Sequence, residues 1–261
     1  MSNHLTLELM TPKGDIAQSI QAIWFAKANF QGEQWLACDG ATGVIFPVAG
    51  ELMLDDHQLL PPYAFQQTST HASKLTFSEN AVFCGIRFNP TVLPELERSA
   101  HPIVAKSSLN AIAKTLQQSA NLEKFVTLVK SYFTSQHRLN QHNKHSKHLI
   151  RNLIELTPLE TAYQRAPLSQ RQLERQVKEQ CGVTPKYFER IYRVKLAKQA
   201  IKKNPEQSFA DIAVECGFTD QPHLIKEFKA IMHVTPAKYR KLLKDAQTKQ
   251  TKLIKITEKN N

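Results

Sequence analysis

The sequence predicts an α+β protein: a β-rich N-terminal domain that ends in helices, followed by an all-α domain of two helix-turn-helix units joined by a long helix. Three observations support this order. Before residue 90, short runs of β-branched and aromatic residues are separated by turn signals. After residue 90, apolar residues recur at helical spacing. From residue 147 onward, one helical pattern occurs twice, with a constant offset of 51 residues.

The N-terminal half contains expected strands followed by expected helices. The strands are apolar, aromatic and β-branched runs over residues 22–30, 43–48, 74–77 and 81–88. Asp39-Gly40 and Pro61-Pro62 mark turns between these runs, and Asn89-Pro90 ends the last one. Helical periodicity then predicts helices over residues 91–98, 109–118 and 122–132.

Length and composition indicate one or two globular domains, since the chain has 261 residues and is 41% hydrophobic. No apolar run is long enough to span a membrane and residues 1–30 do not resemble a secretion signal, so we expect a cytoplasmic protein with no membrane partner. The cysteines lie far apart without a CxxC pair, which indicates reduced core thiols. They are Cys38, Cys84, Cys181 and Cys216. We expect no metal or other cofactor.

The positive charge is confined to the second half. Residues 1–137 carry 9 Lys and Arg against 11 Asp and Glu, whereas residues 138–261 carry 25 against 12. A basic domain indicates a polyanionic partner, and a solvated helical surface explains part of the same excess. We therefore expect a β-rich domain over residues 1–134, a linker over 135–146, a helical domain over 147–243 and a disordered basic tail over 244–261.

Histidines gather in and beside the expected linker. They are His137, His142, His145 and His148. A metal site is one interpretation, but structural metal sites need closely spaced ligands on a folded frame, and no cysteine accompanies these histidines. The composition of this segment favours a polar linker.

The second helix-turn-helix unit spans residues 208–239. Ser208 is expected to cap its first helix, with Asp211 completing a variant of the capping box. Gly217 is expected to end that helix in a left-handed conformation. Thr219 is expected to cap the second helix, with Pro222 in its first turn. A short helix braced across the start of a second helix is the geometry that enters a DNA major groove.

The first unit lies 51 residues upstream and has the same order of elements. Ser169 and Gln172 are expected to form a capping box. Gln170 and Arg171 then point outward, and their side chains suit the edges of adenine and guanine. Residues 185–203 are expected to form one long helix between the units. If both units read one face of a duplex, this helix sets a separation of roughly 34 Å.

These motifs resemble the C-terminal domain of the AraC/XylS family of bacterial transcription regulators. The matching segments are LSQRQLERQVKEQCGVTPKYF from Leu168, ADIAVECGF from Ala210, and GFTDQPHLIKEFK followed by VTPAKYR from Gly217. The resemblance covers about residues 147–243 and implies a seven-helix domain with recognition helices over 169–180 and 219–232. Two positions depart from the family pattern. His233 replaces a glycine and requires a strained left-handed residue or a different helix end, and Val177 replaces a phenylalanine.

The outward positions and the resemblance together predict the DNA contacts. The residues expected to contact DNA from the two recognition helices are Ser169, Gln170, Arg171, Gln172, Glu174, Arg175, Thr219, Asp220, Gln221, His223 and Lys226. Weaker contacts to phosphate groups are expected from Lys202, Lys203 and Arg240.

Two short motifs in the N-terminal half resemble the sensor domains of one branch of this family. They are Cys38-Asp39-Gly40 with the GVIFPV run that follows, and GIRFNP from Gly85. The resemblance implies a domain that holds a small effector or mediates dimerisation. Trp24, Trp35, Arg87 and Phe88 are candidates for lining an effector pocket, with Arg87 facing an anionic group. The alternative interpretation is that the aromatic residues belong to the core and Arg87 is paired within the fold.

Three function classes follow from these features. The first is a sequence-specific transcription regulator, and we expect it to act as an activator. Its expected partners are double-stranded promoter DNA, RNA polymerase, a small-molecule effector and a second copy of the chain in a homodimer. The second is an enzyme that uses Cys38 or Cys84 with a histidine, or a DNA-repair alkyl acceptor, but no catalytic triad, metal motif or phosphate loop supports it. The third is an architectural protein that binds DNA without sequence preference. Gln170 and Arg171 favour the first class over this one, because their side chains are suited to reading bases and not only to binding phosphate.

Overall fold

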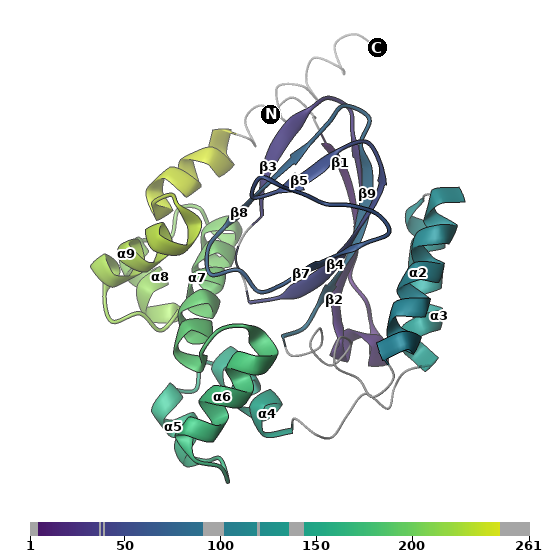
Figure 1. The fold of residues 1–261 in the computed structure, drawn as a ribbon. Helices are drawn as coiled ribbons and strands as arrows, with labels where there is room; N and C mark the ends of the chain where they lie inside the picture. Colours follow the sequence, from purple (N-terminus) through teal and green to yellow (C-terminus); the bar gives the residue numbers. More distant parts are fainter. Residues whose placement is uncertain are drawn as a thin grey trace.

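The computed structural model of the chain describes residues 5–36, 38, 40–90, 102–118, 121–135 and 144–245. Its N-terminal strands are β1 (Leu5–Met10), β2 (Ile20–Ala28), β3 (Gly32–Leu36), β4 (Thr42–Ala49), β5 (Leu52–Leu54), β6 (His57–Gln58), β7 (Ala64–Gln66), β8 (Ser73–Phe77) and β9 (Val82–Phe88). They form two antiparallel sheets that curve around one core (Figure 1), with the orders β1-β2-β9-β4-β7 and β3-β8-β5-β6. A 3-10 helix, η1 (Gly14–Gln18), connects β1 to β2.

Both faces of the five-stranded sheet are covered. One face packs against the second sheet around Ala26 and Phe83. The other face, with Phe25 and Ile86, packs against helices α2 (Pro102–Gln118) and α3 (Leu122–Ser135), which lie outside the barrel in Figure 1. β9 is central in this sheet and buried on both sides, which explains why its sequence does not alternate between apolar and polar residues.

The structure confirms the four expected strands and extends or trims them by a few residues. It adds β1, β3, β5, β6 and β7, which the sequence patterns did not predict. The expected helices over 109–118 and 122–132 are present as α2 and α3, and α2 begins earlier, at Pro102. The expected helix over 91–98 lies outside the described residues, as do residues 136–143 of the expected linker and residues 246–261 of the expected tail.

The end of the expected linker is helical, which corrects one boundary of the prediction. Helix α4 (Lys144–Ile154) begins before residue 147, and the hydroxyl of Ser146 is buried and donates to the Oε1 atom of Gln180 at 2.7 Å. Polar composition alone did not reveal this helix, because its apolar residues come only in its second half. His145 and His148 lie on this helix, and the described residues hold no cluster of metal-ligating side chains.

The C-terminal half is helical throughout. Its helices after α4 are α5 (Leu159–Gln164), α6 (Gln170–Cys181), α7 (Pro185–Lys203), α8 (Phe209–Glu215) and α9 (Gln221–Met232), and a last helix covers residues 236–245. α5 and α6 are the first helix-turn-helix unit, and α8 and α9 are the second. α7 contributes to the core of both units, with Phe188 packed in the first and Ile191, Val194 and Ile201 in the second. The long helix therefore fixes the two units relative to each other.

Local capping explains where the recognition helices begin. Ser169 and Gln172 form the expected capping box at α6, and Ser208 caps α8 by accepting from the amide of Asp211 at 3.1 Å. At α9 the prediction was wrong by one residue. Asp220, and not Thr219, is the cap, and its carboxylate accepts from the amide of His223 at 2.7 Å. A carboxylate at this position also interacts favourably with the positive end of the helix dipole.

The ends of the two recognition helices differ. Gly182 ends α6 with a left-handed backbone at φ 74°, and His233 ends α9 with φ 58°. Two alternatives were expected for His233, a strained left-handed residue or a different helix end, and the structure confirms the first. A non-glycine residue is strained in this region, so His233 must be held by contacts of its own.

Candidate nucleic-acid interface

The first recognition helix presents exposed polar side chains at its N-terminal end. Gln170, Arg171 and Arg175 are exposed on α6. Ser169 and Gln172 are exposed too, but the capping box occupies both: the amide and the hydroxyl of Ser169 donate to Gln172 Oε1, at 3.0 Å and 2.9 Å. Arg171 and Arg175 lie one helical turn apart on a helix whose N-terminus also carries partial positive charge. This end of α6 is therefore suited to phosphate groups and to guanine.

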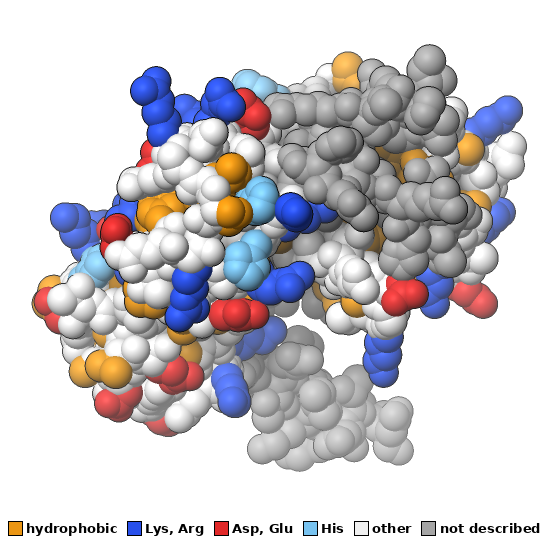
Figure 2. All heavy atoms as spheres, turned by 90° about the horizontal axis from the view of Figure 1, so that it is seen from below, with side chains coloured by type: hydrophobic (Ala, Val, Ile, Leu, Met, Phe, Trp, Pro, Cys, Tyr) orange, Lys and Arg blue, Asp and Glu red, His pale blue; other side chains and the backbone are white. Residues whose placement is uncertain are grey.

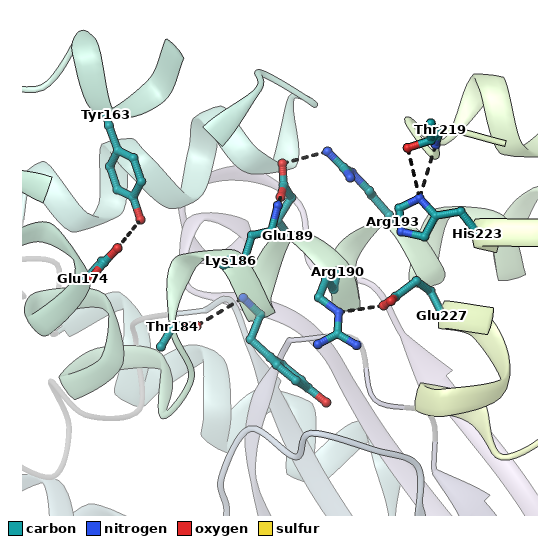
Figure 3. Close-up of polar contacts among 11 residues, drawn as sticks. Tyr163, Glu174, Thr184, Lys186, Glu189, Arg190, Arg193, Thr219, His223 and Glu227 are labelled. Carbon is teal, nitrogen blue, oxygen red and sulfur yellow. Dashed lines mark hydrogen bonds and ion pairs between the residues drawn. The ribbon is translucent and has the colours of Figure 1, made fainter. Parts of the chain in front are cut away.

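Glu174 is held in place on the same helix. Its Oε1 atom accepts from the hydroxyl of Tyr163 on α5 at 3.3 Å (Figure 3). The same atom accepts from the side-chain amide of Gln170 at 2.8 Å. Burial, together with the negative charge of Glu174, raises the pKa of Tyr163, so its hydroxyl stays protonated and donates. The carboxylate thus has a fixed orientation, and carboxylates accept from the exocyclic amine of cytosine.

The second recognition helix presents a different set of groups. Gln221 and Lys226 are exposed on α9, and the carboxylate of Asp220 is used as the helix cap. The imidazole of His223 packs edge-on against the ring of Phe218, with the ring centroids 5.5 Å apart. Its Nδ1 atom accepts from the amide of Thr219 at 3.3 Å (Figure 3). With Nδ1 as acceptor, the neutral ring carries its proton on Nε2, which makes that atom a donor.

Ion pairs along α7 connect the units. Glu227 of α9 is 8% exposed, and its Oε2 atom lies 2.6 Å from Nε of Arg190 on α7. Glu189, 5% exposed on α7, pairs with Arg193 at 2.7 Å and Lys186 at 3.4 Å (Figure 3). Both carboxylates are therefore compensated, as buried charges must be. The pair of Arg190 with Glu227 ties the second recognition helix directly to the connecting helix.

The three expected phosphate-binding residues are placed differently. Lys202 and Lys203 are exposed at the end of α7. The guanidinium of Arg240 donates to the carbonyl of Gln207 at 2.6 Å and lies over the ring of Phe209 at 3.8 Å. These contacts give Arg240 a structural role at the start of α8. Figure 2 shows Lys and Arg side chains spread over the helical part of the molecule, with acidic side chains among them.

The structure does not bring the four expected effector residues together. Phe88 is fully buried in the core beneath α2 and α3, and the ring of Trp24 lies over Gly85, where a Cβ atom would collide with it. Trp35 is 52% exposed and lies beside His233 of the helical domain. Arg87 alone of the four lines the polar recess described next.

That recess lies between the two sheets at the side of the barrel nearest the helical domain. Its lining residues are Leu36, Cys38, Ala41, Gln66, Gln67, Ser69, His71, Ser73 and Arg87. The space inside it is about 10 Å³, which is about the volume that one water molecule needs. The recess is therefore polar and far smaller than the usual small-molecule site.

The described cysteines show no sign of nucleophilic chemistry. All four are buried, and none of them is in a disulfide. Burial raises the pKa of Cys84 strongly and that of Cys216 to about 11, so both thiols stay protonated at neutral pH, and the thiolate is the reactive form. Cys38 donates its thiol proton to the carbonyl of Ser69.

None of the described helices is long and apolar enough to cross a membrane.

Residues 162–242 match the family model described as a helix-turn-helix domain. This region contains α6, α7, α8 and α9, with both recognition helices. The match agrees with the paired units and the capping motifs, and it identifies this region as a helix-turn-helix domain.

Two curated relatives share this region. The chain is 32% identical over 103 residues to the HTH-type transcriptional regulator MtrA of Neisseria gonorrhoeae, covering 38% of this chain and 34% of that protein. It is 38% identical over 74 residues to the HTH-type transcriptional activator RhaS of Escherichia coli, covering 28% and 26%. The chain thus spans about a third of the first relative's length and a quarter of the second's. Both are named as transcription regulators and neither as an enzyme.

One solved structure aligns with most of the chain at low sequence identity. The protein ToxT from Vibrio cholerae aligns over 91% of this chain and 98% of its own, with a TM-score of 0.48 and 12% sequence identity.

Proposed function

We propose that this chain is a sequence-specific transcription regulator that inserts α6 and α9 into adjacent major-groove segments of promoter DNA. The observation that carries the proposal is the pair of helix-turn-helix units on one shared helix, each with polar side chains at the exposed N-terminal end of its recognition helix. Gln170 and Arg171 in the first unit and Gln221 and His223 in the second are the groups we assign to base edges. The match of residues 162–242 to a helix-turn-helix family supports this assignment.

The remaining partners follow from this function. A promoter-bound regulator of this type acts on RNA polymerase, and activation is the direction we propose. The N-terminal domain senses the controlling signal, and Arg87 and His71, which line the small polar recess, are the groups we assign to a small anionic or polar effector. We also propose that two copies of the chain associate through the N-terminal domain, and that the protein acts in the cytoplasm.

Selection of bound sequences from a random DNA pool by the full-length chain tests the DNA-reading proposal. We expect two short conserved half-sites about one helical turn apart, one for each recognition helix. Binding without any preferred sequence would instead assign the chain to the architectural class. A double variant, Gln170→Ala with Arg171→Ala, should lose preference in one half-site only. Lys13→Ala, which removes an exposed positive charge from the N-terminal domain, is the matched control and should select the same sequences.

Phosphate binding is tested separately by salt dependence. Lys202→Ala with Lys203→Ala should weaken binding to every DNA sequence and make the plot of log K against log salt shallower, by a slope of about 1.8 if both residues contact phosphate. An unchanged slope would remove both lysines from the interface.

A further inference from the structure

Among the described residues, a group in the N-terminal domain contacts the helical domain, and we name this group the interdomain clamp. It consists of Trp35, Cys38, Gly40 and residues 69–72. The described contacts of the clamp run to α7 and to the C-terminal end of α9. Figure 1 shows α7, α8 and α9 beside the edge of the barrel where β8 lies, whereas α5 and α6 extend away from it.

The clamp pairs with the end of the second recognition helix. The amide of Ala72 donates to the carbonyl of Ile231 in the last turn of α9 at 2.9 Å, and Ala72 is 2% exposed. The last four carbonyls of a helix have no partner within the helix, so a donor from elsewhere in the chain completes the helix end. The N-terminal domain therefore supplies a hydrogen bond that α9 needs.

His233 extends this contact with its side chain. Its ring lies 5.5 Å from the ring of His71 and 6.3 Å from that of Trp35, measured between centroids. The equivalent residue of the first unit is Gly182, and a Cβ atom there would have no atom within 4 Å. A glycine would relieve the left-handed strain at His233 but would offer no ring to the clamp. The interdomain contact thus gives a physical reason for histidine at this position.

A second route leads from the clamp to α9 through α7. The hydroxyl of Tyr187 donates to the carbonyl of Thr70 at 3.0 Å. The guanidinium of Arg190 lies 4.8 Å from the centre of the Tyr187 ring, and its Nε atom pairs with Glu227 of α9 at 2.6 Å. Residue 70 of the clamp is therefore connected to the second recognition helix by consecutive contacts.

The clamp is tightly fitted against α7. Gly40 has φ 76°, and a Cβ atom there would lie 2.7 Å from Cε2 of Phe188, which is closer than real Cβ contacts. Cys38 packs in the core of the second unit. A displacement of the barrel would therefore disturb packed atoms of α7, and not only solvated side chains.

We infer that the N-terminal domain completes and positions the second recognition helix, so that association of the two domains controls DNA reading by α9 more than by α6. The clamp bonds directly to α9, whereas its contact with the core of the first unit runs through Phe188 of α7. The inference rests on the proposed function in one respect, namely that α9 reads DNA. The mechanism is direct: when the clamp is closed, Ala72 and His71 hold the C-terminal turn of α9, and Tyr187 holds the Arg190–Glu227 pair that orients it. When the clamp opens, both supports are lost together.

Hydrogen–deuterium exchange of the full chain without DNA tests whether the clamp is closed in solution. His233→Gly and His71→Ala should each raise the exchange rate of peptides covering residues 70–73 and the end of α9 by more than tenfold. Peptides covering α6 should be unchanged. Gly182→Ala, at the equivalent helix end of the first unit, is the matched control and should leave residues 70–73 as they are. Unchanged exchange in both clamp variants would show that the contact is not formed and would overturn the inference.

Selective control of α9 is tested with the selected operator and two altered forms, each with one half-site scrambled. Tyr187→Phe removes only the hydroxyl that binds Thr70, and His71→Ala removes only the ring beside His233. Both should weaken binding at least threefold on DNA that keeps the α9 half-site and should leave binding unchanged on DNA that keeps only the α6 half-site. Equal weakening on both altered forms would contradict the inference. If the chain showed no sequence preference, the proposed function would fail, and the exchange experiment would still decide whether the clamp exists.

Discussion

The two helix-turn-helix units have the same plan but anchor their recognition helices differently. In the first unit, the hydroxyl of Tyr163 on α5 binds Glu174 on α6. The second unit has Val214 and Ile225 at the positions 51 residues later, and Val214 is 76% exposed. The polar support within the first unit is therefore absent from the equivalent positions of the second.

The second unit takes its polar supports from outside. Glu227 ties α9 to α7, where the first unit has Gln176, and Ala72 caps the end of α9 from the N-terminal domain. The first unit instead has an arginine in the first turn of its recognition helix, with Arg171 where the second has Pro222. The comparison indicates a division of roles: α6 is supported within the helical domain, whereas α9 also depends on the N-terminal domain and is open to control.

The largest expected effect on the free energy of unfolding comes from substitutions in the cores of the two units. Phe228 in the second unit and Val177 in the first are equivalent and fully buried. Phe228→Ala should lower the free energy of unfolding by about 3–5 kcal/mol, and Val177→Ala by about 2 kcal/mol, because fewer buried carbon atoms are removed. Urea unfolding followed by circular dichroism measures both. Similar losses for the two variants would show that the first core is as tightly packed as the second.

The ion pair of α9 provides the next test. Glu227→Gln should lower the free energy of unfolding by about 1–3 kcal/mol, since it leaves Arg190 without its charged partner in a part-buried site. Glu174→Gln in the first unit should lower it by only about 0.5–1 kcal/mol, because an amide oxygen still accepts from Tyr163. Thermal unfolding of the full chain compares the two. A larger loss of unfolding free energy for Glu174→Gln than for Glu227→Gln would contradict the proposal that α9 depends more than α6 on contacts outside its own unit.

Base reading by the first unit should be strong and local. Arg171→Ala is expected to weaken binding by about 1–3 kcal/mol at one operator position and to relax the preference there. Pro222, its equivalent in α9, has no side-chain donor, so Pro222→Ala should leave the selected bases unchanged. Binding measurements on operators with single substitutions check both variants. An equal loss for Arg171→Ala on all sequences would reassign Arg171 to a phosphate contact.

Features set by neighbouring residues were predictable from the sequence. The capping box of Ser169 and Gln172, the cap at Ser208 and the left-handed Gly217 depend only on residues within one turn. The miss at Thr219 has the same local origin. Thr219 and Asp220 both have cap-forming side chains, and only the backbone geometry determines which one is used.

Features set by distant residues were not predictable in this way. β1 and β3 are short or largely exposed strands, and their sequences lack the continuous apolar runs that indicated the buried strands. The clamp joins residues 69–72 to Ile231 and His233, and no local pattern connects these segments. One signal was present: a histidine at a helix end that favours glycine is strained on its own, so a compensating contact could have been inferred there.

The helix ends give the smallest expected change in stability. His233→Gly should change the free energy of unfolding by less than about 1 kcal/mol, because relief of the left-handed strain, about 1–2 kcal/mol, is offset by loss of the ring contacts, about 0.5–1.5 kcal/mol. In a His71→Ala chain, where one ring contact is already gone, the same substitution should stabilise by about 1 kcal/mol. A double-mutant cycle by urea unfolding measures this coupling directly. Additive changes would mean that the rings of His71 and His233 do not interact, and the strain at His233 would then have no compensation from His71.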